Sequence, residues 1–149
     1  MFTPHQIAFS AAAVGLLVSL SCSPRTSPPA QGGDFDLVAK SVTYKPNPVQ
    51  VGDKVVFDHV VGNKGTNTVK GGTYCVDLYV DGRDVSFDHA TSDILPGGSV
   101  PYSMGRGYYH WQPTKAGRYH YRLVLDERNM LRERIETNNV LEGDIDVVP

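Results

Sequence analysis

Short runs of alternating apolar and polar residues, separated by residues that favour turns, account for most of the chain after residue 33. In residues 73–80, Tyr74, Val76, Leu78 and Val80 occupy every second position. Because successive side chains of a β-strand point to opposite faces, this alternation predicts strands with one buried face. Turn residues recur at intervals of roughly 8–12 residues, which is typical of a β-sandwich or barrel. We therefore expect an all-β fold.

The turn residues set the expected ends of the strands. Pro46 and Pro48 end the first strand, because proline cannot donate a backbone hydrogen bond, and Asp81-Gly82 predicts a tight hairpin turn. Only residues 126–135 have some helical character, and they are short and heavily charged. The expected strands cover residues 35–44, 55–61, 73–80, 84–87, 99–104 continued by 108–111, 117–125 and 140–148.

The first 33 residues differ in composition from the rest. From Phe2 to Ser21 there is no Lys, Arg, Asp or Glu, and residues 7–20 are apolar or small throughout. This run is shorter than the about 20 residues of a membrane-spanning helix, and it suits the apolar centre of a signal peptide. We predict a signal peptide over residues 1–21, a disordered Pro/Ser/Gly tether over 22–33, and one folded domain over 34–149.

Cys22 directly follows the apolar run and is one of only two cysteines in the chain. The segment from Val18 to Cys22 resembles a bacterial lipobox, in which the cysteine receives diacylglycerol and becomes the mature N-terminus. The resemblance implies an exported lipoprotein anchored to a membrane, on the periplasmic side of the outer membrane if the cell is Gram-negative. Two alternatives stay open, namely an ordinary cleaved signal with an unmodified Cys22 and a disulfide between Cys22 and Cys75.

Charge and motifs argue against two classes of protein. The formal net charge is -2, with 14 Lys and Arg against 16 Asp and Glu, so the basic excess of a nucleic-acid-binding protein is missing. The chain also lacks a nucleophile motif and a phosphate-binding glycine loop. Glu133 and Glu136 could serve glycoside cleavage only if they faced a cleft. We expect neither nucleic-acid binding nor enzyme activity.

The order of signals over the folded part resembles the CARDB domain, a bacterial adhesion-related module. The resemblance implies an immunoglobulin-like fold with two antiparallel sheets and about seven strands, and a role in binding or adhesion. It rests on Asp36-Leu37, Gly52-Asp53, Val61-Gly62-Asn63-Lys64-Gly65, Leu78-Tyr79-Val80-Asp81-Gly82, Leu95-Pro96-Gly97, Trp111, Gly117, Leu125-Asp126 and Glu133-Arg134-Ile135-Glu136-Thr137-Asn138-Asn139.

Oxygen-bearing side chains concentrate in residues 126–139, and oxygen is the ligand that Ca²⁺ prefers. The spacing does not follow an EF-hand, and three arginines in the segment would compete for the carboxylates. The alternative is a connection whose asparagines satisfy turn backbone groups, and we favour it, so no cofactor is expected. The candidate Ca²⁺ ligands are Asp126, Asn129, Glu133, Glu136 and Asn138.

The histidines show no metal-ligand pair such as His-x-His. They are His59, His89, His110 and His120 within the folded part. We interpret them as structural or surface residues. The alternation places His59 inward, where we expect it to be partly buried and hydrogen-bonded to a neighbour.

The densest aromatic stretch precedes residue 112 and is the candidate binding surface. Exposed tyrosines supply the contact area typical of interfaces and sugar-stacking sites, and core packing is the alternative. The candidate residues are Tyr102, Arg106, Tyr108, Tyr109 and His110. The sequence therefore predicts a tethered extracytoplasmic binding or adhesion module whose partner is a protein or glycan of the cell envelope. A structural component of the envelope that pairs through a strand edge is the alternative, followed by a small hydrolase.

Overall fold

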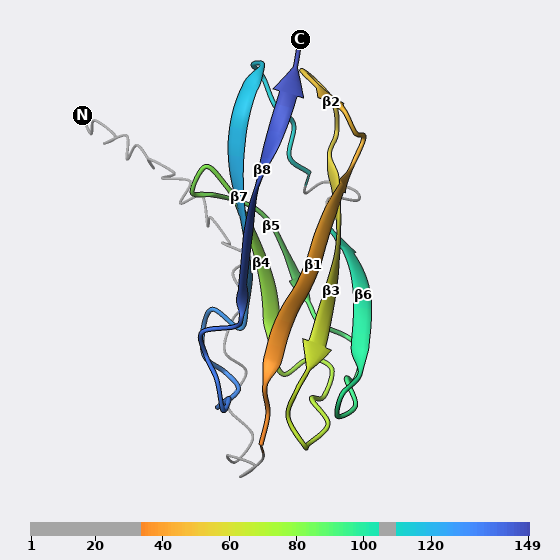
Figure 1. Cartoon of the computed structure of the whole chain (residues 1–149), viewed down its shortest axis with the longest axis vertical. Coiled ribbons are helices and arrows are strands. Elements are labelled where there is room, and N and C mark those ends of the chain that lie inside the picture. The colour runs from red at the N-terminus through yellow and green to blue at the C-terminus, as the bar shows by residue number, and fades with distance from the viewer. Residues whose placement is uncertain (1–33, 105–109) are drawn as a thin grey trace, which may run out of the picture.

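The alternating runs form strands that pack as two facing sheets (Figure 1). The computed structural model describes residues 34–104 and 110–149. The predicted signal peptide and tether, with Cys22, lie outside the described residues. The strands are β1 (Leu37–Lys45), β2 (Val49–Gln50), β3 (Val56–Asn63), β4 (Cys75–Val80), β5 (Arg83–His89), β6 (Ser99–Met104), β7 (Gly117–Leu125) and β8 (Val140–Val148).

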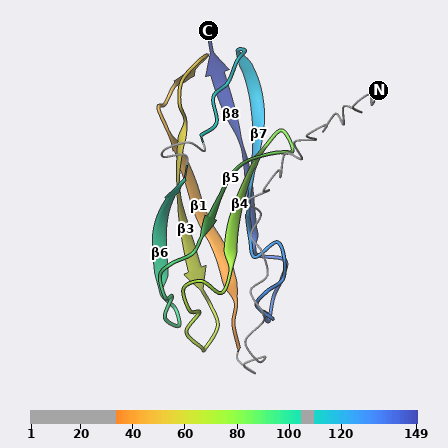
Figure 2. The ribbon, with the colours of Figure 1, turned by 180° about the vertical axis from the view of Figure 1, so that it is seen from behind.

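One sheet contains three strands in the order β1-β3-β6, and the other contains five in the order β2-β8-β7-β4-β5. Neighbouring strands run antiparallel, except that β2 pairs in parallel with β8 through Val49 and Gln50. The chain crosses from the first sheet to the second at Pro46-Asn47-Pro48, where proline cannot continue the ladder. Figure 2 shows both sheets from behind.

The hydrophobic core lies between the sheets and uses the predicted alternation. On β4 and just before it, Tyr74, Val76, Leu78 and Val80 are at most 2% exposed. Phe57 on β3 is 1% exposed. Burying each such side chain contributes about 1.5–3 kcal/mol, so the core alone can hold a domain of this size.

Tyr121 on β7 lies directly opposite Gly143 on β8. A Cβ atom at Gly143 would lie 2.5 Å from the Tyr121 hydroxyl oxygen and 2.6 Å from its Cζ atom. The missing side chain therefore lets the Tyr121 ring lie against the β8 backbone. There the ring packs against Phe57 and Tyr44, with centroid distances of 6.2 Å and 6.5 Å.

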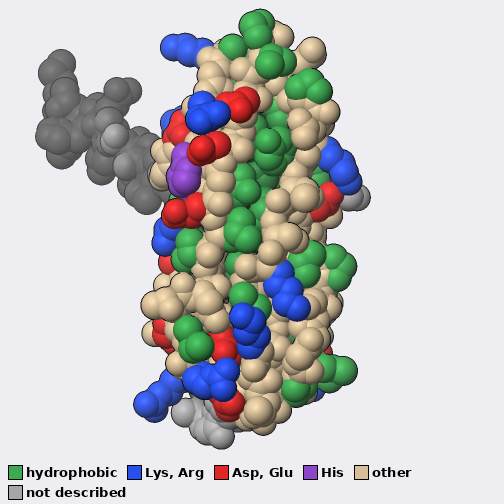
Figure 3. All heavy atoms as spheres, in the orientation of Figure 1, with side chains coloured by type: hydrophobic (Ala, Val, Ile, Leu, Met, Phe, Trp, Pro, Cys, Tyr) green, Lys and Arg blue, Asp and Glu red, His purple; other side chains and the backbone are tan. Residues whose placement is uncertain are grey.

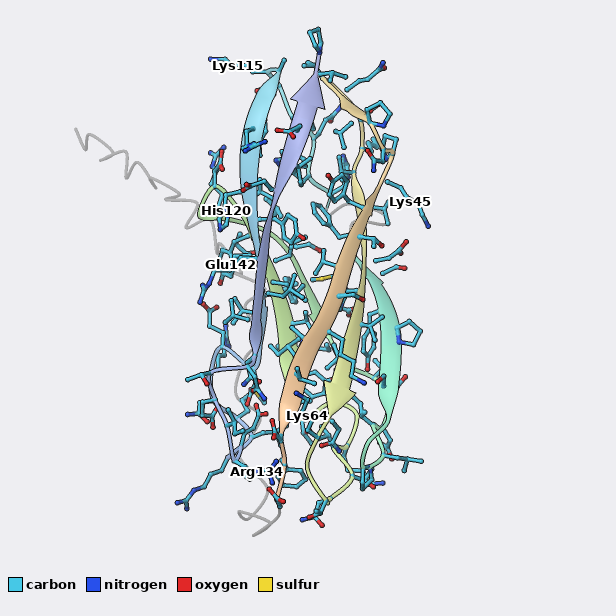
Figure 4. The ribbon with its side chains drawn as sticks, viewed as in Figure 1. Lys45, Lys64, Lys115, His120, Arg134 and Glu142 are labelled. Atoms are coloured by element: carbon cyan, nitrogen blue, oxygen red, sulfur yellow. The ribbon has the colours of Figure 1, made fainter. Side chains whose placement is uncertain are left out.

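The outer face of β7 and β8 carries a row of cross-strand ion pairs. Each pair joins residues that lie directly opposite each other on the two strands. His120 and Glu142 in this row point outward on the same side of the molecule (Figure 4). Because the side chains are largely exposed, water screens each pair, and the row contributes little to stability. The pairs are Arg118–Asp146 at 2.9 Å, His120–Asp144 at 3.0 Å and Arg122–Glu142 at 3.3 Å.

The structure confirms the all-β sandwich. The described residues contain no helix at all, and therefore none that is long and apolar enough to cross a membrane. Residues 126–139 form turns, bends and one bridge, so the helical character of residues 126–135 in the sequence does not lead to a helix. Two details differ from expectation: the two-residue strand β2 brings the number of strands to eight, and its pairing with β8 is parallel. The expected strand at 108–111 falls partly outside the described residues, and Trp111 forms an isolated bridge with Val55.

Candidate binding site

A hollow of about 290 Å³ opens beside the turn between β4 and β5, and we call it the upper hollow. The turn after β4, which forms part of its lining, lies in the upper half of the view in Figure 1, next to β7. Three parts of the chain meet there: the β4–β5 turn, the segment before β7, and β7 itself. The lining residues are Val80, Asp81, Arg83, Asp84, Val85, Trp111, Gln112, Pro113, Thr114 and Tyr119.

The β4–β5 turn is fixed in place by β7. Asp81 and Gly82 have positive φ angles of 48° and 72°, which are the backbone conformations of a tight type I′ hairpin turn. The Asp81 N–H donates to the His120 carbonyl at 2.8 Å, and the His120 N–H donates to Asp81 Oδ1 at 2.9 Å. The predicted Asp-Gly turn is thereby confirmed, and it holds one wall of the hollow rigid.

Two aromatic side chains form the floor of the upper hollow. Trp111 and Tyr119 meet edge to face, with a centroid distance of 5.0 Å and an interplanar angle of 69°. Both rings are only partly buried and pack against the hydrophobic core. Backbone and hydroxyl contacts hold them, since Val55 N–H donates to the Trp111 carbonyl at 2.9 Å and the Tyr119 hydroxyl donates to the Lys115 carbonyl at 2.9 Å.

Polar side chains surround this aromatic floor. Gln112 Nε2 donates to the Gly52 carbonyl at 2.6 Å, which leaves its carbonyl oxygen as an acceptor. Arg83, Asp84 and Thr114 are exposed. The ion pairs found among the described residues include neither Arg83 nor Asp84. The upper hollow thus combines a fixed apolar floor with polar groups that face solvent.

A second, shallower depression of about 280 Å³ lies on the outer face of the three-stranded sheet. Its charged member, Asp58, accepts hydrogen bonds from Lys45 and Ser103. Because these local partners already occupy the carboxylate, the upper hollow is the better candidate site.

The structure divides the predicted aromatic surface. Tyr102 on β6 points toward the core, where its ring stacks on His59 at 5.5 Å with an interplanar angle of 21°. Its hydroxyl lies 3.5 Å from that of Tyr74. His110 is partly buried. The remaining members, Arg106, Tyr108 and Tyr109, lie outside the described residues.

His59 corrects one prediction. It is 1% exposed, as its inward position indicates, but both ring nitrogens are buried without a hydrogen-bond partner. The Tyr102 ring stacks on it, and the Tyr102 hydroxyl lies beside that of Tyr74. Burial lowers the pKa of His59 to about 4, and the nearby carboxylate of Asp58 offsets this only in part.

The candidate Ca²⁺ ligands lie at the opposite end of the sandwich, which we call the lower end: residues 34–36, 63–72, 90–98 and 126–139. Asp126 accepts hydrogen bonds from the N–H groups of Met130 and Leu131 at 3.0 Å and 2.7 Å. Glu136 accepts from the Glu133 N–H at 3.0 Å. The Asn129 N–H donates to the Asp126 carbonyl at 2.7 Å. Carboxylates, and not the asparagine side chains of the alternative interpretation, satisfy the backbone N–H groups of this segment.

Glu133 and Asn138 connect the same segment to the start of β1. Glu133 accepts from the Leu37 N–H and, at 2.8 Å, from Asn139 Nδ2, and Asn138 Nδ2 donates to Asp36 Oδ1 at 2.6 Å. Burial raises the pKa of Glu133 to about 7 and that of Asp126 to about 6, against the hydrogen bonds that they accept. Across the described chain no three His, Cys, Asp or Glu side chains are grouped to hold a metal ion.

Cys75 is 3% exposed and lies on β4, with its sulfur 3.6 Å from His89 Nδ1. The chain contains only one other cysteine, Cys22, so acylation of Cys22 and a bond between the two sulfurs exclude each other within one molecule. Cys22, on which lipid is predicted, lies outside the described residues.

The two facing sheets, the crossover of the chain at β2 and the order of strands define an immunoglobulin-like sandwich domain. The family model named CARDB matches residues 34–143. The chain therefore belongs to the CARDB family, as its motifs indicate.

Solved structures agree with this assignment. The solution structure of a CARDB domain from Pyrococcus furiosus is 26% identical with a TM-score of 0.62, covering 78% of this chain and 97% of that domain. A crystal structure of the same domain in complex with di-metal ions has a TM-score of 0.63 at 26% identity, covering 78% and 96%. A domain from Methanosarcina acetivorans, named as part of a cell-surface protein, shares the fold at 22% identity and a TM-score of 0.58, covering 77% and 93%. No curated protein matches the chain.

Sequence reasoning missed most of the upper hollow. The sequence predicts a strand at 108–111, a turn at Asp81-Gly82 and a strand at 117–125, which contains Tyr119. The turn and the strand at 117–125 are confirmed. The sequence contains one signal for a site at this turn. Two charged residues, Arg83 and Asp84, follow Asp81-Gly82 directly, where an alternating strand would include an apolar residue.

Proposed function

We propose that this chain is an exported, non-catalytic binding module that is anchored to a membrane through lipid on Cys22 and uses the upper hollow as its binding surface. The observation that carries the proposal is the placement of the hollow. The described chain begins at Asp34, at the lower tip of the sandwich, whereas the β4–β5 turn that lines the hollow lies in the upper half (Figure 1). A domain tethered by its N-terminal side would direct the hollow away from the membrane.

The length of the predicted tether suits this arrangement. Residues 22–33 comprise 33 − 22 + 1 = 12 residues, which span at most about 40 Å when fully extended and about 20 Å as a flexible coil. The domain would therefore stay close to the membrane, and its upper part would face other components of the envelope. The Methanosarcina domain, which has the same fold, is named as part of a cell-surface protein, and this agrees with a position outside the membrane.

A binding role is favoured over catalysis by the composition of the hollow. Among the described residues, its lining contains aromatic, carboxylate, guanidinium and amide groups, but no Ser, Cys or His that could form a nucleophile and base pair. Glu133 and Glu136, the carboxylates considered for glycoside cleavage, lie at the lower end and accept backbone hydrogen bonds. We also propose that the lower end holds the fold without a metal ion, although the Pyrococcus domain was crystallised with two.

Assembly through strand edges, the alternative function, has less support. β6 carries Pro101 at the edge of its sheet, and proline blocks pairing with a further strand. β1, at the other edge, has an irregularity between Ala39 and Ser41. Both features are typical of edges that are protected from pairing.

The anchor is tested by the intact mass of the mature protein purified from cells. We expect a chain that begins at Cys22 and carries acyl groups, and a Cys22→Ser variant that lacks this mass and is released from the membrane. Digestion of intact cells or spheroplasts with added protease would report exposure of the domain. A mature chain with an unmodified Cys22, or one in which Cys22 and Cys75 are joined, would refute the lipid anchor.

A further inference from the structure

We infer that the upper hollow binds a neutral carbohydrate, with one sugar ring against Trp111 and Tyr119. This inference rests on the proposed binding function and names the ligand class of the same site. A pyranose has an apolar face of C–H groups and a rim of hydroxyls. The hollow has the matching arrangement, because its aromatic floor is partly exposed and its rim is polar.

The size of the hollow favours a small ring. Pockets for drug-sized ligands range from about 300 to 1,000 Å³, and the volume of about 290 Å³ lies at the lower limit of that range. Such a hollow accommodates part of a chain of sugars, with the neighbouring units in solvent. Nucleotides and long acyl chains need more enclosed space.

The charge of the lining favours a neutral ligand. Arg83 contributes one positive charge and Asp81 one negative charge. The Asp84 carboxylate lies on the other face of β5, near Asp77 and Tyr79. A phosphate or carboxylate ligand would meet as much repulsion as attraction, whereas hydroxyl groups can accept from Arg83 and donate to the Gln112 carbonyl oxygen.

Some of the hydrogen-bond donors and acceptors that line the hollow remain available to the hydroxyl groups of a sugar. The Tyr119 hydroxyl and one N–H of the Gln112 amide already have backbone acceptors. The Gln112 carbonyl oxygen and the Thr114 hydroxyl remain as acceptors, and Arg83 and Thr114 remain as donors. Fixed aromatic rings also reduce the entropy lost on binding. An extended peptide fits less well, because Pro113 offers no N–H and the lining consists mainly of side chains.

Trp111 is the only tryptophan in the chain, so its fluorescence reports directly on the hollow. We propose titrating the full-length protein with cellohexaose, chitohexaose, maltohexaose and mannohexaose, and screening it on an array of neutral and charged glycans. We expect a saturable change in emission with at least one neutral oligosaccharide. Arg83→Ala should weaken this binding by about ten-fold, since it removes a hydrogen bond to a charged group, and Gln112→Ala should also weaken it.

Arg118→Ala is the matched control, because Arg118 is an exposed cation on β7 that pairs with Asp146 outside the hollow. This variant should bind like the wild type. Both hollow variants change exposed residues, and their melting temperatures would confirm that they fold. A flat titration with no array signal, a preference for charged glycans, a response to peptides alone, or binding that survives both substitutions would overturn the inference. Each of these outcomes leaves the mass and protease results unaffected, so failure of the ligand class is distinguishable from failure of the anchored module.

Discussion

The two ends of the sandwich use polar side chains in opposite ways. At the lower end, Asp36 is fully buried, and it accepts hydrogen bonds from Arg134 at 3.0 Å and from Asn138 at 2.6 Å. In the upper hollow, Arg83 and Thr114 face solvent beside half-buried rings. Figure 4 shows the two ends, with Arg134 and Lys64 at one and Lys115 at the other. Buried polar groups must find partners within the protein, whereas exposed ones are available to a ligand.

Apolar and charged side chains are also separated on the surface between the two ends. Hydrophobic side chains follow the seam between β8 and β1, and charged side chains flank it (Figure 3). Substitutions at the lower end should therefore change stability, and substitutions at the hollow should change binding. The following predictions, from the largest effect to the smallest, test that division.

The largest loss of stability is expected for Asn63→Ala at the lower end. Asn63 is 1% exposed and makes three hydrogen bonds, donating to the carbonyls of Asn67 at 2.7 Å and Ile94 at 3.0 Å and accepting from the Gly65 N–H at 2.9 Å. At about 1–1.5 kcal/mol each, their loss should lower the free energy of unfolding by about 4 kcal/mol. Denaturant unfolding measures this. Asn67→Ala is the control, because Asn67 contributes only its backbone and should change little.

His59 should make the middle of the sandwich sensitive to acid. Its pKa is about 4 in the folded state, against an ordinary value of 6.5 for histidine exposed to water. The unfolded chain therefore takes up this proton first, and the contribution of His59 to stability is complete above pH 6.5 and is lost as the pH falls toward 4. The loss is about 3 kcal/mol, since one pKa unit corresponds to about 1.4 kcal/mol.

Comparing the wild type with His59→Leu isolates this effect, because the raised pKa values of Glu133 and Asp126 contribute equally to both proteins. The difference in unfolding free energy should grow between pH 6.5 and 4 in favour of the variant. At pH 7 the variant should already be more stable, since two unpaired nitrogens are removed from the core. A constant difference across this pH range would show that His59 has a partner in solution.

At the upper hollow, Asp84→Ala should change the free energy of unfolding by less than about 0.5 kcal/mol, because exposed residues without buried partners contribute little to stability. Thermal melting and denaturant unfolding measure this. A loss comparable with that of Asn63→Ala would mean that Asp84 holds the fold, and the contrast between the two ends would fail.

The smallest effect is expected from calcium. Because Asp126, Glu133 and Glu136 accept hydrogen bonds from backbone and side-chain N–H groups, adding Ca²⁺ or excess chelator should leave the melting temperature unchanged. A stabilisation that saturates with Ca²⁺ and is reversed by chelator would assign a metal to the lower end.

The strands could be predicted from sequence because their signal is local. Alternation in residues 73–80 identified the inward face of β4 correctly, and Pro46 marked the end of β1. The site could not be predicted in the same way. The upper hollow exists only because the turn at Asp81-Gly82 is held against β7, next to Trp111. Likewise, alternation placed His59 inward, but whether it finds a hydrogen-bond partner depends on side chains from other strands.

Gly143 has a consequence for how β7 and β8 choose their alignment during folding. Sliding β8 by two residues would keep every side chain on its proper face and would still set Arg118 beside Asp144 and His120 beside Glu142, so the ion pairs tolerate the slip. Tyr121, however, would then lie opposite Leu141 or Ile145, where a Cβ atom in place of the glycine would force the buried Tyr121 ring to shift. The absent side chain of Gly143 therefore favours the native alignment, which the ion pairs alone do not select.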